Sequence, residues 1–313
     1  MTRAFLFPGQ GSQAVGMGRE LADAFAPARE VFEEVDDALS QRLSRLMFEG
    51  PEDELVLTEN AQPALMAVSL AVLRVLEREG NLVLRDAAAF VAGHSLGEYS
   101  ALAAAGALSL AETARLLKTR GRAMQEAVPV GAGAMAAIIG LEIDAVADLA
   151  REAAGDEVCD LANDNGGGQV VVSGSAAAVE RAIALAGEKG AKRAIPLSVS
   201  APFHCALMAP AAEVMAAALE EAGMAEPAVP VIANVTAAPV ADPDEIGRLL
   251  VRQVTSMVRW RESMLYLREA DTGAVVELGA GRVLAGLARR IDRDFETASI
   301  GAPAEVETFL ASL

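Results

Sequence analysis

Short apolar segments alternate with helical patterns along this chain of 313 residues, and this alternation constrains the fold more than any other feature. Residues 4–7 and 87–92 are apolar runs, and each is followed by a glycine-containing turn. Apolar residues recur at helical spacing over 65–79, after Ser95 and again from Ser109. Strands that are apolar throughout are typical of parallel sheets with helices on both faces. We therefore expect an α/β protein with a mostly parallel sheet.

The middle of the chain has a second, different order of elements. Its patterns predict strand, helix, strand, strand, helix and strand, in that order, over 133–140, 141–154, 158–162, 169–173, 176–187 and 192–199. This βαββαβ order is that of a ferredoxin-like unit. Together with a glycine-bounded hinge at 128–133, it predicts a small domain at 129–198, inserted into a large domain formed by 1–128 and 199–313.

Charge and cysteine content exclude several classes of function. Lys and Arg number 26 and Asp and Glu number 44, so the net charge is −18 at pH 7. We expect no nucleic-acid partner, because such binding needs a basic face. Cys159 and Cys205 are too few for a disulfide framework and have no metal-type spacing, which favours a reducing compartment. No segment resembles an export signal or a membrane span, and we expect a cytoplasmic monomer.

The segment G-H-S-L-G at 93–97 matches the G-x-S-x-G pattern, with an apolar strand before it and a helical pattern after it. In such a turn the serine is pushed out of the backbone, and the flanking glycines avoid clashes. The helix that follows directs its free N–H groups at a developing oxyanion. We interpret Ser95 as a nucleophile. The alternative is a glycine-rich turn in which the serine only caps the helix.

Only two histidines, His94 and His204, are available to activate Ser95. Neighbouring side chains on a tight turn usually point apart, so His94 receives no firm role. His204, in S-A-P-F-H-C, is therefore the candidate base. The alternative is a buried, hydrogen-bonded histidine without a catalytic role. No carboxylate lies near His204 in the sequence, and no orienting acid can be chosen from the residues alone.

One arginine lies on the apolar side of the helix that follows Ser109. With residues placed about 100° apart, Arg120 projects into the apolar arc between Leu116 and Met124. A buried guanidinium is costly without a partner. Two partners are open: an internal Asp or Glu, or a substrate carboxylate, whose two oxygens match the guanidinium fork. A simple esterase has no need of the second.

The loop F-P-G-Q-G-S-Q follows the first predicted strand. Loops at the carboxyl ends of parallel strands meet at the active site. From this loop Gln10 could donate an amide N–H to the oxyanion; the alternative is an ordinary connecting turn. The glycines do not form a phosphate loop, because no G-K-[ST] follows.

Taken together, the segments resemble the malonyl-CoA:acyl carrier protein transacylases. The resemblance is carried, in order, by F-P-G-Q-G-S-Q, G-H-S-L-G-E-Y, R-G-x-x-M-Q-E, Q-V-V-V-S-G, F-H-C, V-P-V-I-A-N-V, L-V-R-Q and E-L-G-A-G-R-V-L. It covers almost the whole chain, and the set is far more specific than G-x-S-x-G alone. The family has a large α/β-hydrolase-like domain that carries a small ferredoxin-like one, in agreement with the pattern above.

The resemblance implies a role for each matching residue. Ser95 would be the acylated nucleophile, His204 its base, and Arg120 the holder of the free carboxylate of malonate. Gln10 and the N–H of Leu96 would form the oxyanion hole. Gln253 matches the residue whose backbone carbonyl orients the histidine in place of an acid. Phe203 resembles the bulky residue that disfavours an α-methyl branch on the substrate.

The activity implied is transfer of malonyl from malonyl-CoA to the phosphopantetheine thiol of acyl carrier protein, for fatty-acid elongation. No metal or bound cofactor is expected; malonyl-CoA is the substrate. Three alternatives stay open: the same transfer for a polyketide pathway, a Ser/His thioesterase or esterase, and a carrier-binding protein without activity.

Overall fold

Strand β1 (Thr2–Phe7) shows why helices cover both faces of the large sheet. In the computed structural model, which describes residues 2–312, Ala4 and Leu6 point to one face and Phe5 and Phe7 to the other. All four are fully buried. Apolar residues in succession therefore mark a strand that lies inside the protein.

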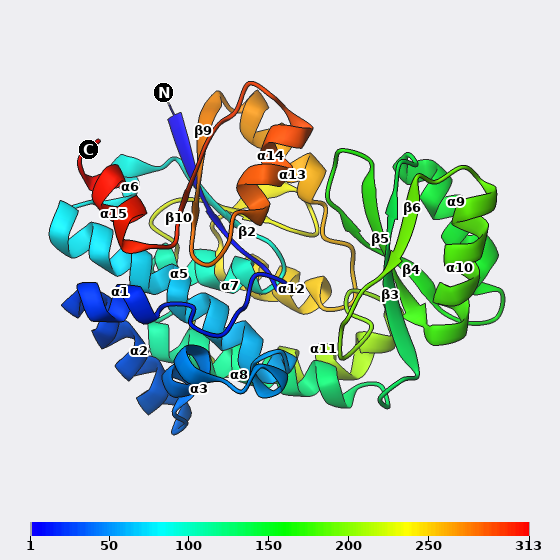
Figure 1. The fold of residues 1–313 in the computed structure, drawn as a ribbon, viewed down its shortest axis with the longest axis horizontal. Helices are drawn as coiled ribbons and strands as arrows, with labels where there is room; N and C mark the ends of the chain where they lie inside the picture. Colours follow the sequence, from blue (N-terminus) through cyan, green and yellow to red (C-terminus); the bar gives the residue numbers. More distant parts are fainter. Residues whose placement is uncertain (1, 313) are drawn as a thin grey trace.

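Within residues 2–312 the large sheet has six strands in the order β10-β9-β1-β2-β7-β8 (Figure 1). Neighbours pair in parallel except for β7 and β8. The mostly parallel sheet expected from the sequence is thus confirmed. Besides β1, its strands are β2 (Phe90–Gly93), β7 (Val231–Ala233), β8 (Ala238–Val240), β9 (Thr272–Leu278) and β10 (Glu296–Ile300).

Two groups of helices cover the large sheet. The face of Ala4 and Leu6 packs against α13 (Trp260–Glu269) and α14 (Val283–Ile291). The face of Phe5 and Phe7 belongs to the larger core. The helices of that core are α1 (Arg19–Ala24), α2 (Ala26–Leu39), α3 (Leu43–Glu49), α4 (Glu52–Leu55), α5 (Thr58–Gly80), α6 (Leu84–Ala87), α7 (Leu96–Ala104), α8 (Leu110–Glu126), α11 (Ala209–Glu221), α12 (Pro243–Gln253) and α15 (Pro303–Leu310).

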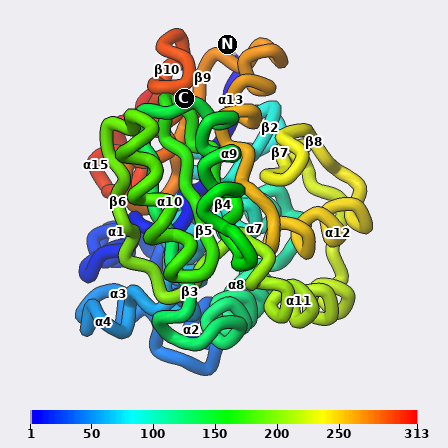
Figure 2. Tube along the Cα trace, turned by 90° about the vertical axis from the view of Figure 1, so that its right-hand side faces the viewer, coloured from blue at the N-terminus to red at the C-terminus, as the bar shows by residue number. Residues whose placement is uncertain are grey.

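The small sheet stands beside this body (Figures 1 and 2) and has the order β4-β5-β3-β6, antiparallel throughout. Two helices pack on its outer face, while Met135, Ala137 and Val171 on its inner face join the core of the large body. The βαββαβ order is confirmed, whereas the boundaries 128/129 and 198/199 stay a prediction. The elements are β3 (Gly133–Ile139), α9 (Ile143–Ala154), β4 (Cys159–Asp164), β5 (Gln169–Ser175), α10 (Ala176–Glu188) and β6 (Arg193–Pro196).

Three elements differ from their predicted bounds by three residues or more. The run 87–92 is strand only from Phe90, because Ala87 ends α6 and Ala88 and Ala89 connect that helix to the strand. The last strand of the small sheet ends at Pro196 instead of 199; the Leu197 N–H still donates to the Met135 carbonyl, and residues 197–199 line a cavity. The helix predicted over 65–79 begins earlier, at Thr58. Its first turns are polar although they are buried, so no apolar period marked them in the sequence.

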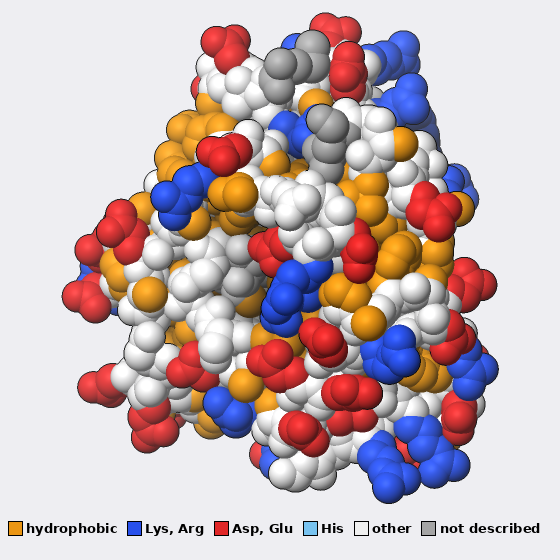
Figure 3. Space-filling model, turned by 90° about the vertical axis from the view of Figure 1, so that its left-hand side faces the viewer, with side chains coloured by type: hydrophobic (Ala, Val, Ile, Leu, Met, Phe, Trp, Pro, Cys, Tyr) orange, Lys and Arg blue, Asp and Glu red, His pale blue; other side chains and the backbone are white. Residues whose placement is uncertain are grey.

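The end of the molecule farthest from the small sheet carries acidic and basic side chains intermixed (Figure 3). This face lies over α1, α2 and α15. The net negative charge is therefore not gathered into one acidic surface there.

The turn from β2 into α7 brings backbone segments into direct contact. A Cβ on Gly93 would lie 1.9 Å from the carbonyl of Gly97, and a Cβ on Gly97 would lie 2.1 Å from the carbonyl oxygen of Phe7. Neither position has room for any side chain, so the first turn of α7 packs directly on the ends of β1 and β2. This is the physical reason for the glycines of G-H-S-L-G.

We expect Gly97→Ala to destabilise the fold by about 3 kcal/mol or more, because the opposing atoms are backbone and cannot move aside cheaply. Gly286→Ala is the matched control: it too is a helical glycine, but a Cβ there meets nothing within 4 Å. It should be neutral or stabilise by about 0.5–1 kcal/mol. Urea unfolding measures both, and equal midpoints for the two variants would contradict the close approach.

Candidate active site

The backbone at Ser95 is strained, with φ 54° and ψ −110°. A non-glycine residue in this region costs about 1–3 kcal/mol and persists only when its surroundings hold it. Asn234 supplies that hold: its Oδ1 accepts from the Ser95 N–H at 2.7 Å, and its Nδ2 donates to the Gly93 carbonyl at 2.7 Å. The turn therefore presents the serine hydroxyl at the start of α7, away from the strand.

Ser95 Oγ lies 2.7 Å from His204 Nε2. The other ring nitrogen, Nδ1, lies 2.9 Å from the Gln253 carbonyl oxygen, which can only accept. Nδ1 must therefore carry the proton, and Nε2 is left as an acceptor facing the hydroxyl. The sequence offered no acid to orient the histidine, and in the structure a backbone carbonyl occupies that position.

His204 is almost completely buried, at 3% exposure. Burial and, after it, the positive charge of Arg120 lower the pKa of His204 to about 3. The imidazole is therefore neutral at physiological pH, which is the form that can accept a proton from Ser95.

Arg120 lies on α8 at 1% exposure, as its helical projection predicted. Its acceptors are neutral. Nη1 donates to Gln62 Oε1 at 2.7 Å, while Nη2 donates to Gln253 Oε1 at 2.9 Å and to Ser95 Oγ at 3.1 Å. The sequence left two partners open, an internal carboxylate or a substrate carboxylate. No carboxylate within residues 2–312 lies at ion-pair distance from this guanidinium, so the internal one is not found there.

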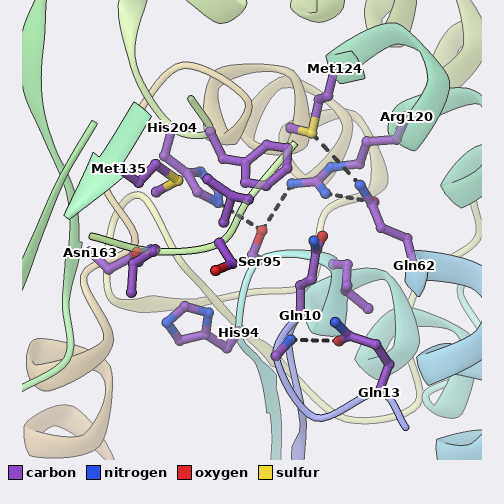
Figure 4. Close-up of a pocket in the computed structure, with 16 residues that line it drawn as sticks. Gln10, Gln13, Gln62, His94, Ser95, Arg120, Met124, Met135, Asn163 and His204 are labelled. Atoms are coloured by element: carbon purple, nitrogen blue, oxygen red, sulfur yellow. Dashed lines mark hydrogen bonds between the residues drawn. The ribbon is translucent and has the colours of Figure 1, made fainter. Parts of the chain in front are cut away.

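These groups face a cavity of about 250 Å³ (Figure 4). Met135 and Asn163 line it from the small sheet, while Ser95, Arg120 and Gln10 line it from the large body. The cavity therefore lies where the two bodies meet, and both contribute to its wall.

The remaining sequence candidates also reach this cavity. Gln10 accepts from Thr58 Oγ1 through its Oε1 at 2.9 Å, so its amide nitrogen is the end available to a ligand. Leu96 is the first residue of α7, and its N–H has no acceptor within the helix. Phe203, at 9% exposure, lines the cavity next to His204. The six residues Gln10, Ser95, Leu96, Arg120, Phe203 and His204 thus share one cavity, with Gln253 directly behind it.

His94 lies at the cavity wall but turns away from the serine–histidine pair. Its Nε2 lies 2.9 Å from Asn165 Oδ1, and its ring packs 5.5 Å from that of Trp260. It therefore connects the turn of Ser95 with the small sheet's glycine-rich turn.

Three contributors were missed by sequence reasoning: Gln62, Asn234 and Glu98. Each is a polar residue buried at 1% exposure. Glu98 and Asn234 lie inside motifs that carry the family resemblance, G-H-S-L-G-E-Y and V-P-V-I-A-N-V. For Asn234 the available signal was a polar residue inside an otherwise apolar segment, whereas Gln62 and Glu98 lie among other polar residues and had no such signal.

A serine on a strained strand–helix turn, a neutral imidazole and free helix N–H groups are the parts of a site for acyl transfer through a covalent intermediate. The added buried cation makes an acid-bearing acyl group the fitting substrate. No three His, Cys, Asp or Glu side chains among the described residues lie close enough to hold a metal ion.

Comparison with known proteins identifies the class. The acyl transferase domain family matches residues 4–303. The chain is 45% identical, over 99% of its length and 96% of the relative's, to the malonyl CoA-acyl carrier protein transacylase of Bacillus subtilis strain 168. It superposes on the acyl-carrier-protein S-malonyltransferase of Bartonella henselae with a TM-score of 0.97, at 55% identity and with 100% and 99% of the two chains covered.

A further solved relative is PlMCAT, a malonyl-transacylase in complex with the type II PKS acyl-carrier protein AntF. It has a TM-score of 0.96, 42% identity and full coverage of both chains. The protein is therefore an acyltransferase enzyme. Within that class, the chain belongs to the family of malonyl CoA-acyl carrier protein transacylases, and the resemblance drawn from its motifs is confirmed.

We expect the reactivity of Ser95 to stay nearly constant from pH 8 to pH 6, because the lowered pKa of His204 keeps the imidazole neutral well below 6.5. An unperturbed histidine would lose about three quarters of its neutral form over the same range. The measurement is the rate of labelling by an uncharged fluorophosphonate, followed by intact mass, with Ser95→Ala as the unlabelled control. Burial raises the pKa of Glu98 to about 7, so the profile is also recorded for Glu98→Gln, which has no carboxyl there to titrate. A sigmoidal loss with a midpoint near 6.5 in both proteins would show that His204 titrates normally.

Proposed function

We propose that this enzyme transfers a malonyl group from malonyl-CoA to the phosphopantetheine thiol of an acyl carrier protein, supplying fatty-acid chain elongation. The single observation that carries the proposal is Arg120, buried beside Ser95 Oγ with neutral acceptors only. An acyl donor that ends in a carboxylate supplies the missing negative charge. An ester or thioester of an uncharged acid would leave it unpaired.

The first half-reaction forms an acyl-enzyme. The malonyl carboxylate pairs with Arg120, which places the thioester carbonyl at Ser95. His204 Nε2 takes the hydroxyl proton as Oγ bonds to the carbonyl carbon. The C–S bond then breaks, CoA leaves with that proton as a thiol, and a malonyl-serine ester remains.

The second half-reaction reverses these steps on another thiol. The phosphopantetheine thiol of the carrier protein gives its proton to His204, attacks the ester carbonyl and leaves as malonyl thioester, while the proton returns to Ser95. A thioester replaces a thioester, so the overall transfer is reversible. The narrow cavity between two bodies disfavours water as a competing nucleophile.

The other candidate residues support this chemistry from fixed positions. The Leu96 N–H and the Gln10 amide would hold the oxyanion that develops on the carbonyl oxygen. The Gln253 carbonyl keeps His204 in the tautomer that accepts at Nε2. Phe203 fills space beside the reacting carbon and would disfavour an α-methyl branch. Discrimination over one methyl amounts to about 1–3 kcal/mol, so this preference is soft.

A polyketide pathway is the second candidate for the same reaction. It is favoured by the likeness to PlMCAT, which was solved with a polyketide carrier protein. The residues described above do not distinguish the two pathways, because both use the same donor and the same thiol. A Ser/His thioesterase would have no use for Arg120.

No helix among the described residues is long and apolar enough to cross a membrane. Cys159 and Cys205 are both buried and unpaired with each other. This supports a reducing compartment. We propose that the enzyme acts in the cytoplasm as a monomer that binds its carrier protein transiently.

The test is intact-protein mass spectrometry after mixing with malonyl-CoA. We expect wild type to gain one malonyl group, Ser95→Ala to gain none, and added holo carrier protein to discharge the adduct. Arg120→Ala should lose the preference for malonyl over acetyl donors, while His204→Ala should slow loading by about 10²–10⁴. Equal loading of acetyl and malonyl on wild type, or release of free malonate in place of transfer, would contradict the proposal.

A further inference from the structure

Glu98 is a buried carboxylate that the proposed mechanism does not use. It lies one helical turn after Ser95 on α7, at 1% exposure, behind the wall of the cavity. Its Oε2 accepts two hydrogen bonds at 2.9 Å, from the Asn234 N–H and from Gln253 Nε2. Burial raises the pKa of Glu98 to about 7, although both hydrogen bonds and Arg120 act against that rise. Burying a carboxyl group costs free energy, which suggests that Glu98 has a role in the site.

The amide of Gln253 has only one orientation that satisfies its neighbours. Nε2 donates to Glu98 Oε2 and, at 3.0 Å, to the Ser95 carbonyl oxygen, so both of its protons face acceptors. Oε1 then faces Arg120 and accepts from Nη2. A flipped amide would place an NH₂ group against the guanidinium and an oxygen against two other oxygens. The Ser95 carbonyl can only accept and the guanidinium can only donate, so both favour the first orientation. Glu98 Oε2, which also accepts from the Asn234 N–H, adds a second acceptor for Nε2 and favours it further.

The amide between Glu98 and Arg120 also keeps the two charges apart. A carboxylate in direct contact would use the guanidinium fork that a substrate carboxylate needs. Glu98 instead contacts Gln253, which in turn contacts Arg120, so the side of the guanidinium that would bind a substrate carboxylate stays free. The arrangement provides a fixed, partly compensated cation that can still bind an anion.

From this geometry we propose that Glu98 is a positioning residue: by fixing the Gln253 amide it holds Arg120 toward Ser95, and so sets the preference for acyl donors that carry a free carboxylate. The inference rests on the proposed function, because the preference concerns malonyl over acetyl donors. It assigns Glu98 no contact with the substrate.

The experiment compares Glu98→Leu with Glu98→Gln in single-turnover loading from malonyl-CoA and acetyl-CoA. The leucine removes the acceptor, so we expect the malonyl-to-acetyl ratio of loading rate constants at subsaturating donor to fall about ten- to a hundredfold, the scale of one hydrogen bond to a charged group. The glutamine retains an oxygen that can accept from both donors, and the ratio should stay within about threefold of wild type. A ratio of two rates does not depend on how much of a variant is folded.

Two controls separate positioning from a general structural effect. Glu277 is a second buried carboxylate, which accepts from the backbone N–H groups of Leu284 and Ala285 at the start of α14. Glu277→Leu should lower stability and leave the donor ratio unchanged. In an Arg120→Ala background, Glu98→Leu should cause no further change in the ratio, because the two residues act through one path.

Two outcomes would overturn the role of Glu98: Glu98→Leu slowing both donors by the same factor, or Glu98→Gln losing as much selectivity as Glu98→Leu. These outcomes differ from failure of the proposed function, in which wild type itself would load neither donor on Ser95 or would show no preference between them.

Discussion

A guanidinium buried without a carboxylate is the constraint on which the rest of this site depends. Burying an unpaired charge is costly, and the protein meets that cost only in part, with the amide oxygens of Gln62 and Gln253 and the hydroxyl of Ser95. Glu98 compensates part of the charge through Gln253, but no carboxylate among the described residues contacts the cation in the free enzyme. Because this guanidinium lines the cavity beside Ser95, the proposed function gives it two roles, binding of the acyl donor and selection of donors that carry a carboxylate.

Gln253 connects this cation to the serine–histidine pair. Its backbone carbonyl accepts from His204, its side-chain oxygen accepts from Arg120, and its side-chain nitrogen donates to the carbonyl of Ser95. One residue at the end of α12 therefore places the base, the cation and the nucleophile relative to one another. The positive charge of Arg120 contributes to the low pKa of His204, so a carboxylate bound to Arg120 would offset part of that effect. Under the proposed function, binding of the donor carboxylate at Arg120 would therefore also make His204 a stronger base.

The sequence predicted the parts of the site whose local patterns are strong. The turn at 93–97 was recognisable because steric limits demand glycine on both sides of the serine, and the burial of Arg120 followed from helical geometry alone. The partners of Arg120 were not predictable, because hydrogen bonds between α5, α8 and α12 depend on packing between distant segments. Gln62 was not predicted as a site residue for a related reason. It lies in the first turns of α5, which are polar in sequence although they are buried beneath the site. The apolar run 192–199 likewise did not show where β6 ends, because its last three residues line the cavity.

The most direct test of this account is a crystal structure of the enzyme with malonate esterified to Ser95. We expect the free carboxylate to lie about 2.7–2.9 Å from two nitrogens of Arg120, as a bidentate pair, with Gln253 Oε1 still in contact with the guanidinium. The contact between Arg120 and Ser95 Oγ would be replaced by these bonds. A carboxylate turned toward solvent or held by another cation, with Arg120 bound only to its two amides, would contradict the central claim.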